Sequence, residues 1–257
     1  MNPFVHLIAD YGKADPAFSE VVHRLKNENR TIDVRTTAVR PFSTIATGFW
    51  IEQLGVHNPA FEGLTIYSNT APRAGDSAPR RANEGAGLCY LELDTGVPVL
   101  ATNGGYNLSF VEDHVQEFRA VDAPREGSQF RSRDFFPARV AEIATGDLNS
   151  LGEELSTETI PSKPEAAVCH VDGYGNLKTS IRESEFDSDE ERLTVEIDSR
   201  TRTALYRDAV FEVGEGTLVV APGSAGGEDP YLEVVRRGGS AARLFDKPNP
   251  GETISFR

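Results

Sequence analysis

Two aspartates follow the first apolar segment of the chain. That segment reads FVHLIA; Asp10 comes next, and Asp15 follows beyond a glycine. A carboxylate at the end of a buried strand can accept two hydrogen bonds from a ribose diol as readily as it can bind a metal ion. An aspartate before a helix can also simply cap it. The pair therefore indicates a ribose site, a metal site or helix capping.

Basic and hydroxyl side chains occur in two later segments. The loop NTAPRAGDSAPRR ends with Arg80 and Arg81, and a rigid basic loop after a strand suits an anionic group, although solvated arginines explain it equally well. The segment FRSRDFFPARVA places Arg131 and Ser132 before a predicted helix, where they could face a ligand or only cap the helix. No GxSxG motif accompanies Ser132, so an acylated serine is not favoured.

The segment VDGYGNLKTSI contains a tight turn with three side chains suited to a nucleoside. A base could stack on Tyr174 while Asn176 contacts its edge, and Asp172 could pair with an ammonium group. A plain hairpin turn would use the same residues. On this segment alone the hairpin connection between two strands is favoured, and the binding site is the alternative.

Metal and disulfide chemistry have little support. The two cysteines, Cys89 and Cys169, are far apart, and neither belongs to a CxxC motif, so both are predicted to be buried thiols. The five histidines never pair at ligand spacing: His6, His23, His57, His114 and His170. We therefore expect no histidine metal site.

Alternating strands and helices are predicted to position these residues in the N-terminal part. The apolar strand before Asp10 precedes PAFSEVVHRLKNEN, where Phe18, Val21 and Leu25 recur at helical spacing. TIDVRTTAV, PFSTIATGFWIEQLG and LTIYSNT then predict a strand, a helix and a third strand. This alternation is typical of an α/β domain with a mostly parallel sheet, whose ligands gather at the carboxyl ends of the strands.

The pattern changes in the second half of the chain. After a predicted helix that runs towards Gly146, the chain becomes polar with two prolines and no apolar period, which indicates a linker. Short strands between turns follow, the pattern of a small barrel or sandwich. We therefore predict an α/β domain at residues 1–150, a linker at 151–165 and an all-β, barrel-like domain at 166–257.

Composition limits the partners and the location. The chain has 257 residues and a net charge of −14, with 40 acidic and 26 basic residues, and such a balance disfavours nucleic acid as a partner. Neither an apolar run long enough to span a membrane nor a signal peptide is recognised, so we predict a soluble, cytoplasmic protein without membrane partners. Only five of the basic residues are lysines, which together with the acidity suggests a halophilic source.

Taken in order, these segments resemble the S-adenosylmethionine (SAM) hydroxide adenosyltransferase family and its fluorinase and chlorinase relatives. The similarity spans nearly the whole chain and is carried by IADYGKADPA, VRPF at residues 39–42, PRR, ATNGG, FRSRDFFPARVA, VDGYGNLKTSI and GSAGGEDPYLEVVRRGGSAARL. The resemblance implies a homotrimer that holds SAM, its small-molecule substrate, at subunit interfaces. It implies no cofactor and no metal, with halide as an optional second substrate.

The resemblance also implies roles for individual residues. Asp10 would hold the ribose hydroxyls and Phe42 would lie beneath the sugar, while Tyr174 and Asn176 would face adenine. The remaining residues expected to bind substrate include the methionine contacts, with Asp15 and Asp172 on the ammonium and Tyr231 and Arg236 near the carboxylate; Asn103 and Ser240 complete the set.

The catalytic motifs depart from those of hydroxide-using members. Those members carry an Asp-Pro-Gly loop and a His-Gly-Arg-Asp motif, where this chain has NTAPRAG and RSRD. This chain has Asn and Thr near the position of the motif's aspartate and Arg at the position of its histidine. These three residue types are poor general bases. Ser132 stands where fluorinases have a serine that contacts halide. The expected catalytic residues are Arg80, Arg81, Arg131, Ser132 and Thr70.

Three functions remain open from the sequence. We favour cleavage of SAM by water or hydroxide at ribose C5′, which gives adenosine and L-methionine, because an arginine at position 80 or 81 could still orient and acidify water. Chloride as the nucleophile would give 5′-chloro-5′-deoxyadenosine. A catalytically silent protein that binds SAM or adenosine is the third possibility.

Overall fold

The computed structural model describes residues 2–12, 14–58, 60–70 and 85–257. The chain divides into two compact units, Met1–Ser162 and Lys163–Arg257. Arg80 and Arg81, two of the expected catalytic residues, lie outside the described residues.

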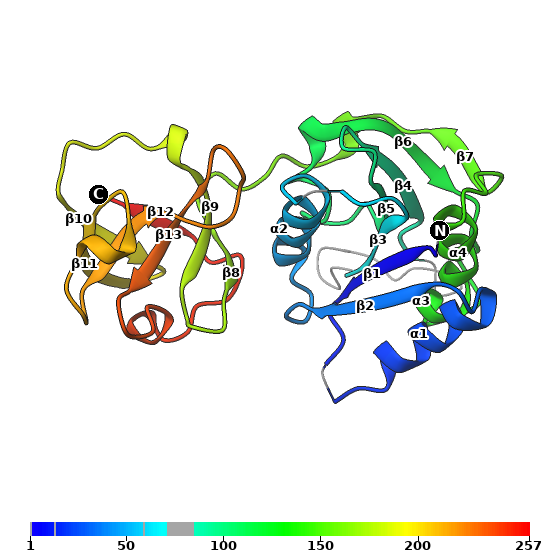
Figure 1. Ribbon diagram of the computed structural model, residues 1–257, viewed down its shortest axis with the longest axis horizontal. Coiled ribbons are helices and arrows are strands. Elements are labelled where there is room, and N and C mark those ends of the chain that lie inside the picture. The colour runs from blue at the N-terminus through cyan, green and yellow to red at the C-terminus, as the bar shows by residue number, and fades with distance from the viewer. Residues whose placement is uncertain (1, 13, 59, 71–84) are drawn as a thin grey trace. The chain divides into compact units, whose positions relative to one another are not determined.

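A seven-stranded sheet forms the centre of the first unit, with the strand order β2-β1-β3-β5-β4-β6-β7 (Figure 1). Three neighbouring pairs are parallel, namely β1/β2, β1/β3 and β3/β5, and the other three are antiparallel. The strands are β1 (Phe4–Ala9), β2 (Asp33–Ala38), β3 (Leu64–Asn69), β4 (Leu88–Leu93), β5 (Pro98–Thr102), β6 (Val115–Val121) and β7 (Leu151–Glu154).

The expectation of a mostly parallel sheet is therefore correct for only half of it. β4 and β5 are joined by a tight turn in which Gly96 has a φ of 75°. A short turn can join only antiparallel strands, because a parallel pair needs a long crossover. The change from βα units to hairpins thus reverses the pairing from β4 onward.

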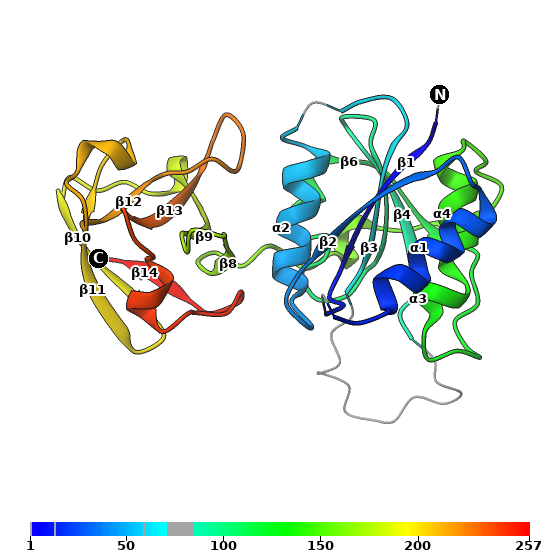
Figure 2. The same ribbon diagram turned by 60° about the horizontal axis from the view of Figure 1, so that its bottom comes forward.

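Helices cover both faces of this sheet, as Figure 2 shows. α2 (Thr44–Gly55) packs on one face, and α1 (Ala17–Glu28), α3 (Arg131–Asp134) and α4 (Phe136–Ala144) lie on the other. Successive strand residues alternate between the two cores, so that Ile8 packs towards α2 and Leu7 towards α1 and α4. With helices over both faces, the carboxyl ends of β1, β2 and β3 are the natural place for a ligand.

The linker expected at residues 151–165 is wrong in its first part. β7 pairs with the edge of β6, a 3₁₀ helix follows at Thr157–Thr159, and Ile160 is buried in the core beneath α2. A four-residue edge strand, LGEE, carries two exposed glutamates and no apolar alternation, so its sequence resembles a loop. The boundary between the units falls after Ser162.

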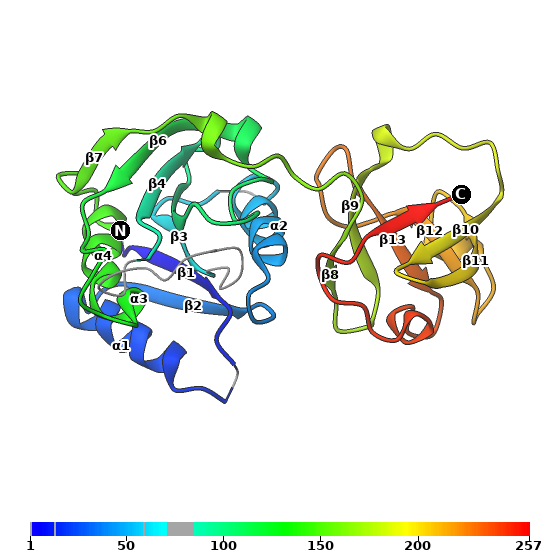
Figure 3. The same cartoon turned by 180° about the vertical axis from the view of Figure 1, so that it is seen from behind.

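A second seven-stranded sheet curls into a nearly closed barrel in the C-terminal unit (Figure 3). Its order is β14-β10-β11-β12-β13-β9-β8, and the two edges meet through an isolated bridge between Ala167 and Thr253. Only β11/β12 is parallel. The strands are β8 (Val168–Val171), β9 (Leu177–Arg182), β10 (Arg192–Ile197), β11 (Arg200–Tyr206), β12 (Leu218–Pro222), β13 (Tyr231–Arg236) and β14 (Ile254–Phe256).

Candidate functional site

Asp10 and Phe42 meet at the carboxyl ends of β1 and β2. The backbone N–H of Phe42 donates to Asp10 Oδ2 at 2.8 Å, and the N–H of Val39 donates to the Ala9 carbonyl at 2.9 Å. Phe42 has a φ of 63°, a left-handed conformation that costs an ordinary side chain about 1 kcal/mol, and its ring is 51% exposed. Asp10 therefore helps to hold an aromatic face in a strained, solvent-facing position beside its own carboxylate.

Asp15 closes the turn after β1 and does not cap the helix. Its Oδ2 accepts from the Gly12 N–H at 3.0 Å, and its own N–H donates to the Gly12 carbonyl at 2.9 Å. The N-cap of α1 is Pro16, which makes no side-chain cap. Asp15 itself is exposed, so its carboxylate faces solvent next to the turn.

Four polar side chains, two of them buried and two partly buried, form a cluster beside Asp10. Tyr11 Oη lies 2.7 Å from Ser132 Oγ and accepts from Asn69 Nδ2 at 3.0 Å, while Tyr67 Oη donates to the Ser132 carbonyl at 2.9 Å. Burial raises the pKa of both tyrosines above the usual value, so both phenols are neutral. The sequence analysis did not identify Tyr11 or Tyr67 as site residues, although Tyr11 directly follows Asp10.

Thr70 and Asn103 are tied into the scaffold. Thr70 is fully buried; its hydroxyl accepts from Thr47 Oγ1 at 2.8 Å, and its carbonyl accepts from Asn107 Nδ2 at 2.7 Å. Asn103 Nδ2 donates to the carbonyl and hydroxyl of Thr159, both at 3.2 Å. These bonds fix the end of β3 and the segment after β5. Thr70 and Asn103 therefore stabilise the backbone around the candidate site.

Arg131 lies close to the start of the described segment that follows residue 84. Its Nη1 donates to the Arg125 carbonyl at 3.2 Å. A Cβ at Gly85 would lie 1.4 Å from Arg131 Nη2, so the guanidinium occupies space that only a glycine leaves open. The arginine beside Ser132 is therefore held by backbone contacts.

In the C-terminal unit, Asp172 organises the predicted turn. Its Oδ1 accepts from the N–H groups of Tyr174 and Asn176, both at 2.9 Å, and its Oδ2 accepts from Asn176 Nδ2 at 3.0 Å. The turn leaves Tyr174 83% exposed. Gly175, with a φ of 87°, packs against Ser240, because a Cβ there would lie 2.1 Å from the serine Oγ.

The two residues expected near the methionine carboxylate lie at opposite ends of β13. Leu177 pairs with Val234, so the turn at residues 172–176 lies at the Arg236 end of the strand. Tyr231 lies five residues away, about 16 Å along a strand, and is fully buried beneath the Arg182 guanidinium at 3.9 Å. The barrel brings Asp172, Tyr174, Asn176 and Ser240 together and leaves Tyr231 apart.

Arg236 lies beside that group. Its Nε donates to the Gly216 carbonyl at 3.2 Å, and its side chain lies against the backbone of Gly239, the neighbour of Ser240. The guanidinium thus belongs to the same end of the barrel as the turn.

A buried ion pair on the barrel was missed by the sequence analysis. Lys178 Nζ lies 2.5 Å from Glu233 Oε1 and 3.1 Å from Ser224 Oγ, and Glu233 is 5% exposed. Burial, together with the Lys178 charge, lowers the pKa of nearby His170. The strand pattern gave no signal for this pair, since charged residues in strands normally face solvent.

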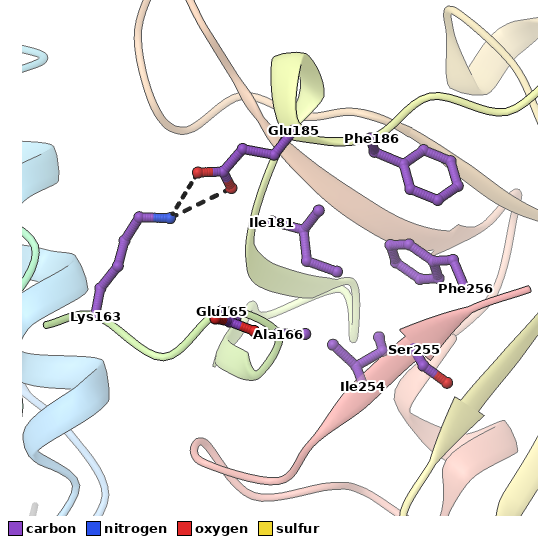
Figure 4. A pocket seen from close by; sticks show the side chains of 9 residues that line it. All are labelled: Lys163, Glu165, Ala166, Ile181, Glu185, Phe186, Ile254, Ser255 and Phe256. Carbon is purple, nitrogen blue, oxygen red and sulfur yellow. Dashed lines mark hydrogen bonds and ion pairs between the residues drawn. The ribbon is translucent and has the colours of Figure 1, made fainter.

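A cavity of about 540 Å³ lies elsewhere on the barrel (Figure 4). Its lining combines apolar side chains such as Ile181, Phe186 and Phe256 with Lys163, which pairs with Glu185 at 3.2 Å. None of the sequence-predicted site residues lines it.

The described residues offer neither a metal-binding cluster nor a membrane-spanning helix. No group of three or more His, Cys, Asp and Glu residues there is arranged to hold a metal ion. No helix in the same part of the chain is long and apolar enough to cross a membrane.

Residues 166–254, which include the Asp172 turn, Arg236 and Ser240, match the family described as SAM hydroxide adenosyltransferase C-terminal domain. The C-terminal unit belongs to this family. The resemblance seen in the sequence is therefore confirmed for the C-terminal unit.

Two solved structures share the fold of the whole chain. An uncharacterised conserved protein from Thermotoga maritima is 20% identical with a TM-score of 0.77, over 98% of this chain and 99% of that chain. A conserved hypothetical protein from Thermus thermophilus is 20% identical with a TM-score of 0.69, over the whole of both chains. No curated protein gives a significant match.

Proposed function

We propose that this protein cleaves SAM by attack of water or hydroxide on ribose C5′, with adenosine and L-methionine as products. The observation that carries the proposal is the family match over residues 166–254, which contains the Asp172 turn. The first unit adds a carboxylate, Asp10, beside an exposed aromatic ring, Phe42. A ribose diol and its sugar face are the complementary ligand for that combination.

The substrate contacts follow from the two groups of residues. Asp10 would bind the ribose hydroxyls over the Phe42 ring. Tyr174, exposed at the tip of its turn, offers a stacking surface for adenine, and Asp172 offers a carboxylate to the methionine ammonium. For the methionine carboxylate we propose Arg236 alone, because Tyr231 is buried at the other end of β13.

The reaction is a balanced in-line substitution. A lone pair of the water oxygen forms the new bond to C5′ as the C5′–S bond breaks, and the bonding electrons stay on sulfur. The sulfonium becomes the neutral thioether of methionine, and the attacking water releases one proton to solvent. The protein's part is to align the water with the breaking bond and to exclude competing solvent.

Activation of the water rests on arginine in this proposal. Thr70 has its hydroxyl engaged by Thr47, and Arg131 stays protonated at any working pH, so neither is a base. Arg80 or Arg81 would lower the pKa of the water, as expected from the sequence. The rate of adenosine formation should then climb with pH.

Chloride is a second candidate nucleophile, and one observation favours it. Ser132, only 4% exposed and hydrogen-bonded to Tyr11, follows Arg131, so a hydroxyl and a permanent cation are adjacent in sequence. Such a pair suits an anion. In that case 5′-chloro-5′-deoxyadenosine forms in proportion to chloride and with little dependence on pH.

One incubation separates these possibilities. Purified protein is given SAM at several chloride concentrations, and the nucleosides are identified by mass, with the Asp10→Ala protein as the control. Adenosine as the sole product in saturating chloride supports the hydrolase. The chlorinated nucleoside would support the halogenase instead, and binding without turnover would leave a silent SAM-binding protein.

A shared site in a homotrimer completes the proposal. The residues proposed for the ribose lie in the first unit and those for adenine in the second. We propose that a ribose group from one subunit and an adenine group from its neighbour form each site.

A further inference from the structure

One hydrogen bond in the cluster beside Asp10 has a direction fixed by its atoms. Asn69 Nδ2 lies 3.0 Å from Tyr11 Oη, and an amide nitrogen can only donate. The phenol oxygen therefore accepts from Asn69, and it lies 2.7 Å from Ser132 Oγ, where either hydroxyl can be the donor. When Tyr11 donates, the Ser132 hydroxyl accepts and its own proton points elsewhere.

Packing keeps this arrangement in place. Tyr67 Oη donates to the Ser132 carbonyl at 2.9 Å, which fixes the backbone of Ser132, and Ser132 is 4% exposed. The ring of Tyr11 is held between Phe18 and Phe130, with centroids at 5.1 and 5.6 Å in edge-to-face contact. Among the described residues, the Ser132 hydroxyl has Tyr11 as its only hydrogen-bond partner.

We propose that Tyr11 is a positioning residue that donates to Ser132 Oγ and so turns the hydroxyl hydrogen of Ser132 towards the attacking nucleophile. This rests on the proposed function, in which the nucleophile reaches C5′ of a ribose bound by Asp10, the neighbour of Tyr11. Ser132 then donates to a lone pair of the water oxygen, or of chloride, and does not accept the proton of water. The raised pKa of Tyr11 keeps the phenol protonated, as donation requires.

The consequence for the reaction is orientation of the nucleophile. A water that accepts from Ser132 has one lone pair fixed, which limits the directions in which its other lone pair can face C5′. Without the Tyr11 hydroxyl, the Ser132 proton can rotate back to other acceptors, and bound substrate meets a poorly aligned nucleophile. The loss should fall on kcat, while the affinity for SAM stays unchanged.

Tyr11→Phe tests the proposal, because it removes a single oxygen. We expect kcat to fall at least about tenfold and the Kd for SAM to stay within about twofold. The matched control is Tyr67→Phe, which removes another buried hydroxyl that contacts only the carbonyl of Ser132. Melting temperatures show whether each variant is folded.

A double-mutant cycle with Ser132→Ala decides whether Tyr11 acts through Ser132. If it does, Tyr11→Phe costs nothing further in the Ser132→Ala background, so the double variant is about as slow as either single one. The proposal would be overturned if the double variant lost kcat by the product of the two single losses, which corresponds to additive free energies. A Tyr11→Phe protein with the wild-type kcat would also overturn it. Should Tyr11→Phe not fold, Asn69→Ala removes the amide that holds the Tyr11 hydroxyl in place, and the same cycle applies.

The activity of the wild-type protein distinguishes failure of the Tyr11 proposal from failure of the proposed function. Turnover of SAM by the wild type together with additive losses in the cycle would reject the role of Tyr11 and leave the proposed function standing. No turnover by the wild type, with folded protein and bound SAM, would reject both.

Discussion

The Asp10 and Asp172 carboxylates each accept hydrogen bonds from backbone N–H groups and so fix the conformation of a turn, in addition to carrying a charge. Asp10 accepts from the N–H of Phe42, and Asp172 accepts from the N–H groups of Tyr174 and Asn176. Each aspartate thus presents an aromatic ring to solvent from a rigid turn. The proposed ligand would meet a preformed surface at both places, which would reduce the entropy cost of binding.

Asp10→Ala should lower the affinity for SAM by about tenfold or more. A charged hydrogen bond of this kind contributes about 1.5–3 kcal/mol, and the variant also releases the strained Phe42 backbone. Isothermal titration with SAM measures the effect. The control is Asp33→Ala, an exposed aspartate on β2 whose ion pair with Lys26 spans 3.8 Å. Equal affinity in the Asp10→Ala protein would reduce Asp10 to a structural residue.

At the scale of elements, the sequence predicted what periodicity and turn residues encode. The spacing of Val21 and Leu25 gave α1 correctly, and the apolar runs gave β1 and β3. It missed the antiparallel half of the first sheet and β7, because pairing direction and a short polar edge strand depend on the neighbouring strands.

The candidate site was predictable to a similar degree. Asp10 and Asp172 were singled out because each stands in a recognisable turn next to a strand. The cluster around Tyr11, Ser132 and Asn69 joins residues up to 121 positions apart, so no local pattern could show it. The position of Tyr231, buried at the far end of β13, needed the register with β9.

Lys178→Ala should destabilise the barrel by about 3 kcal/mol or more. Removing the lysine leaves the Glu233 carboxylate buried without its cation, and that penalty exceeds the net value of the pair. The double variant Lys178→Met with Glu233→Leu should recover most of the loss. Chemical denaturation gives the free energies. Lys163→Ala is the control, because its pair with Glu185 is more exposed and should contribute less than about 1 kcal/mol.

Stability of the barrel should also fall as the pH drops. Burial lowers the pKa of His170 below its ordinary value of 6.5, so the unfolded chain binds a proton more readily than the folded one. The contribution is fully present above the unfolded pKa and is lost as the pH falls below about 6.5. Melting temperatures between pH 7 and pH 5 should therefore decrease less in His170→Gln than in the wild type.

The matched control for this pH series is His23→Gln. His23 is an exposed histidine on α1, outside the barrel. If the two variants and the wild type lose stability in parallel on acidification, His170 is not the group responsible.

At the scale of the whole molecule, the proposed function divides the substrate between the two units. The first would bind the ribose on an α/β sheet, and the second would bind adenine and the methionine ammonium on a barrel. A division of this kind lets subunit assembly complete the site, as the homotrimer proposal requires.

Mixed trimers test whether neighbouring subunits share each site. At a SAM concentration near the wild-type Kd, Asp10→Ala and Asp172→Ala should each lose most activity as pure proteins, because each removes one binding contact from every site. Co-expressed with separate affinity tags and purified through both, the variants form trimers that contain two copies of one and a single copy of the other. In such a ring, about one interface in three joins an intact ribose group from one variant to an intact turn from the other. Mixed trimers should accordingly recover about a third of the wild-type rate at that SAM concentration, with wild-type affinity for SAM at the restored site. If each chain builds its own site, every site in the mixture carries one lesion, and activity stays at the level of the pure variants.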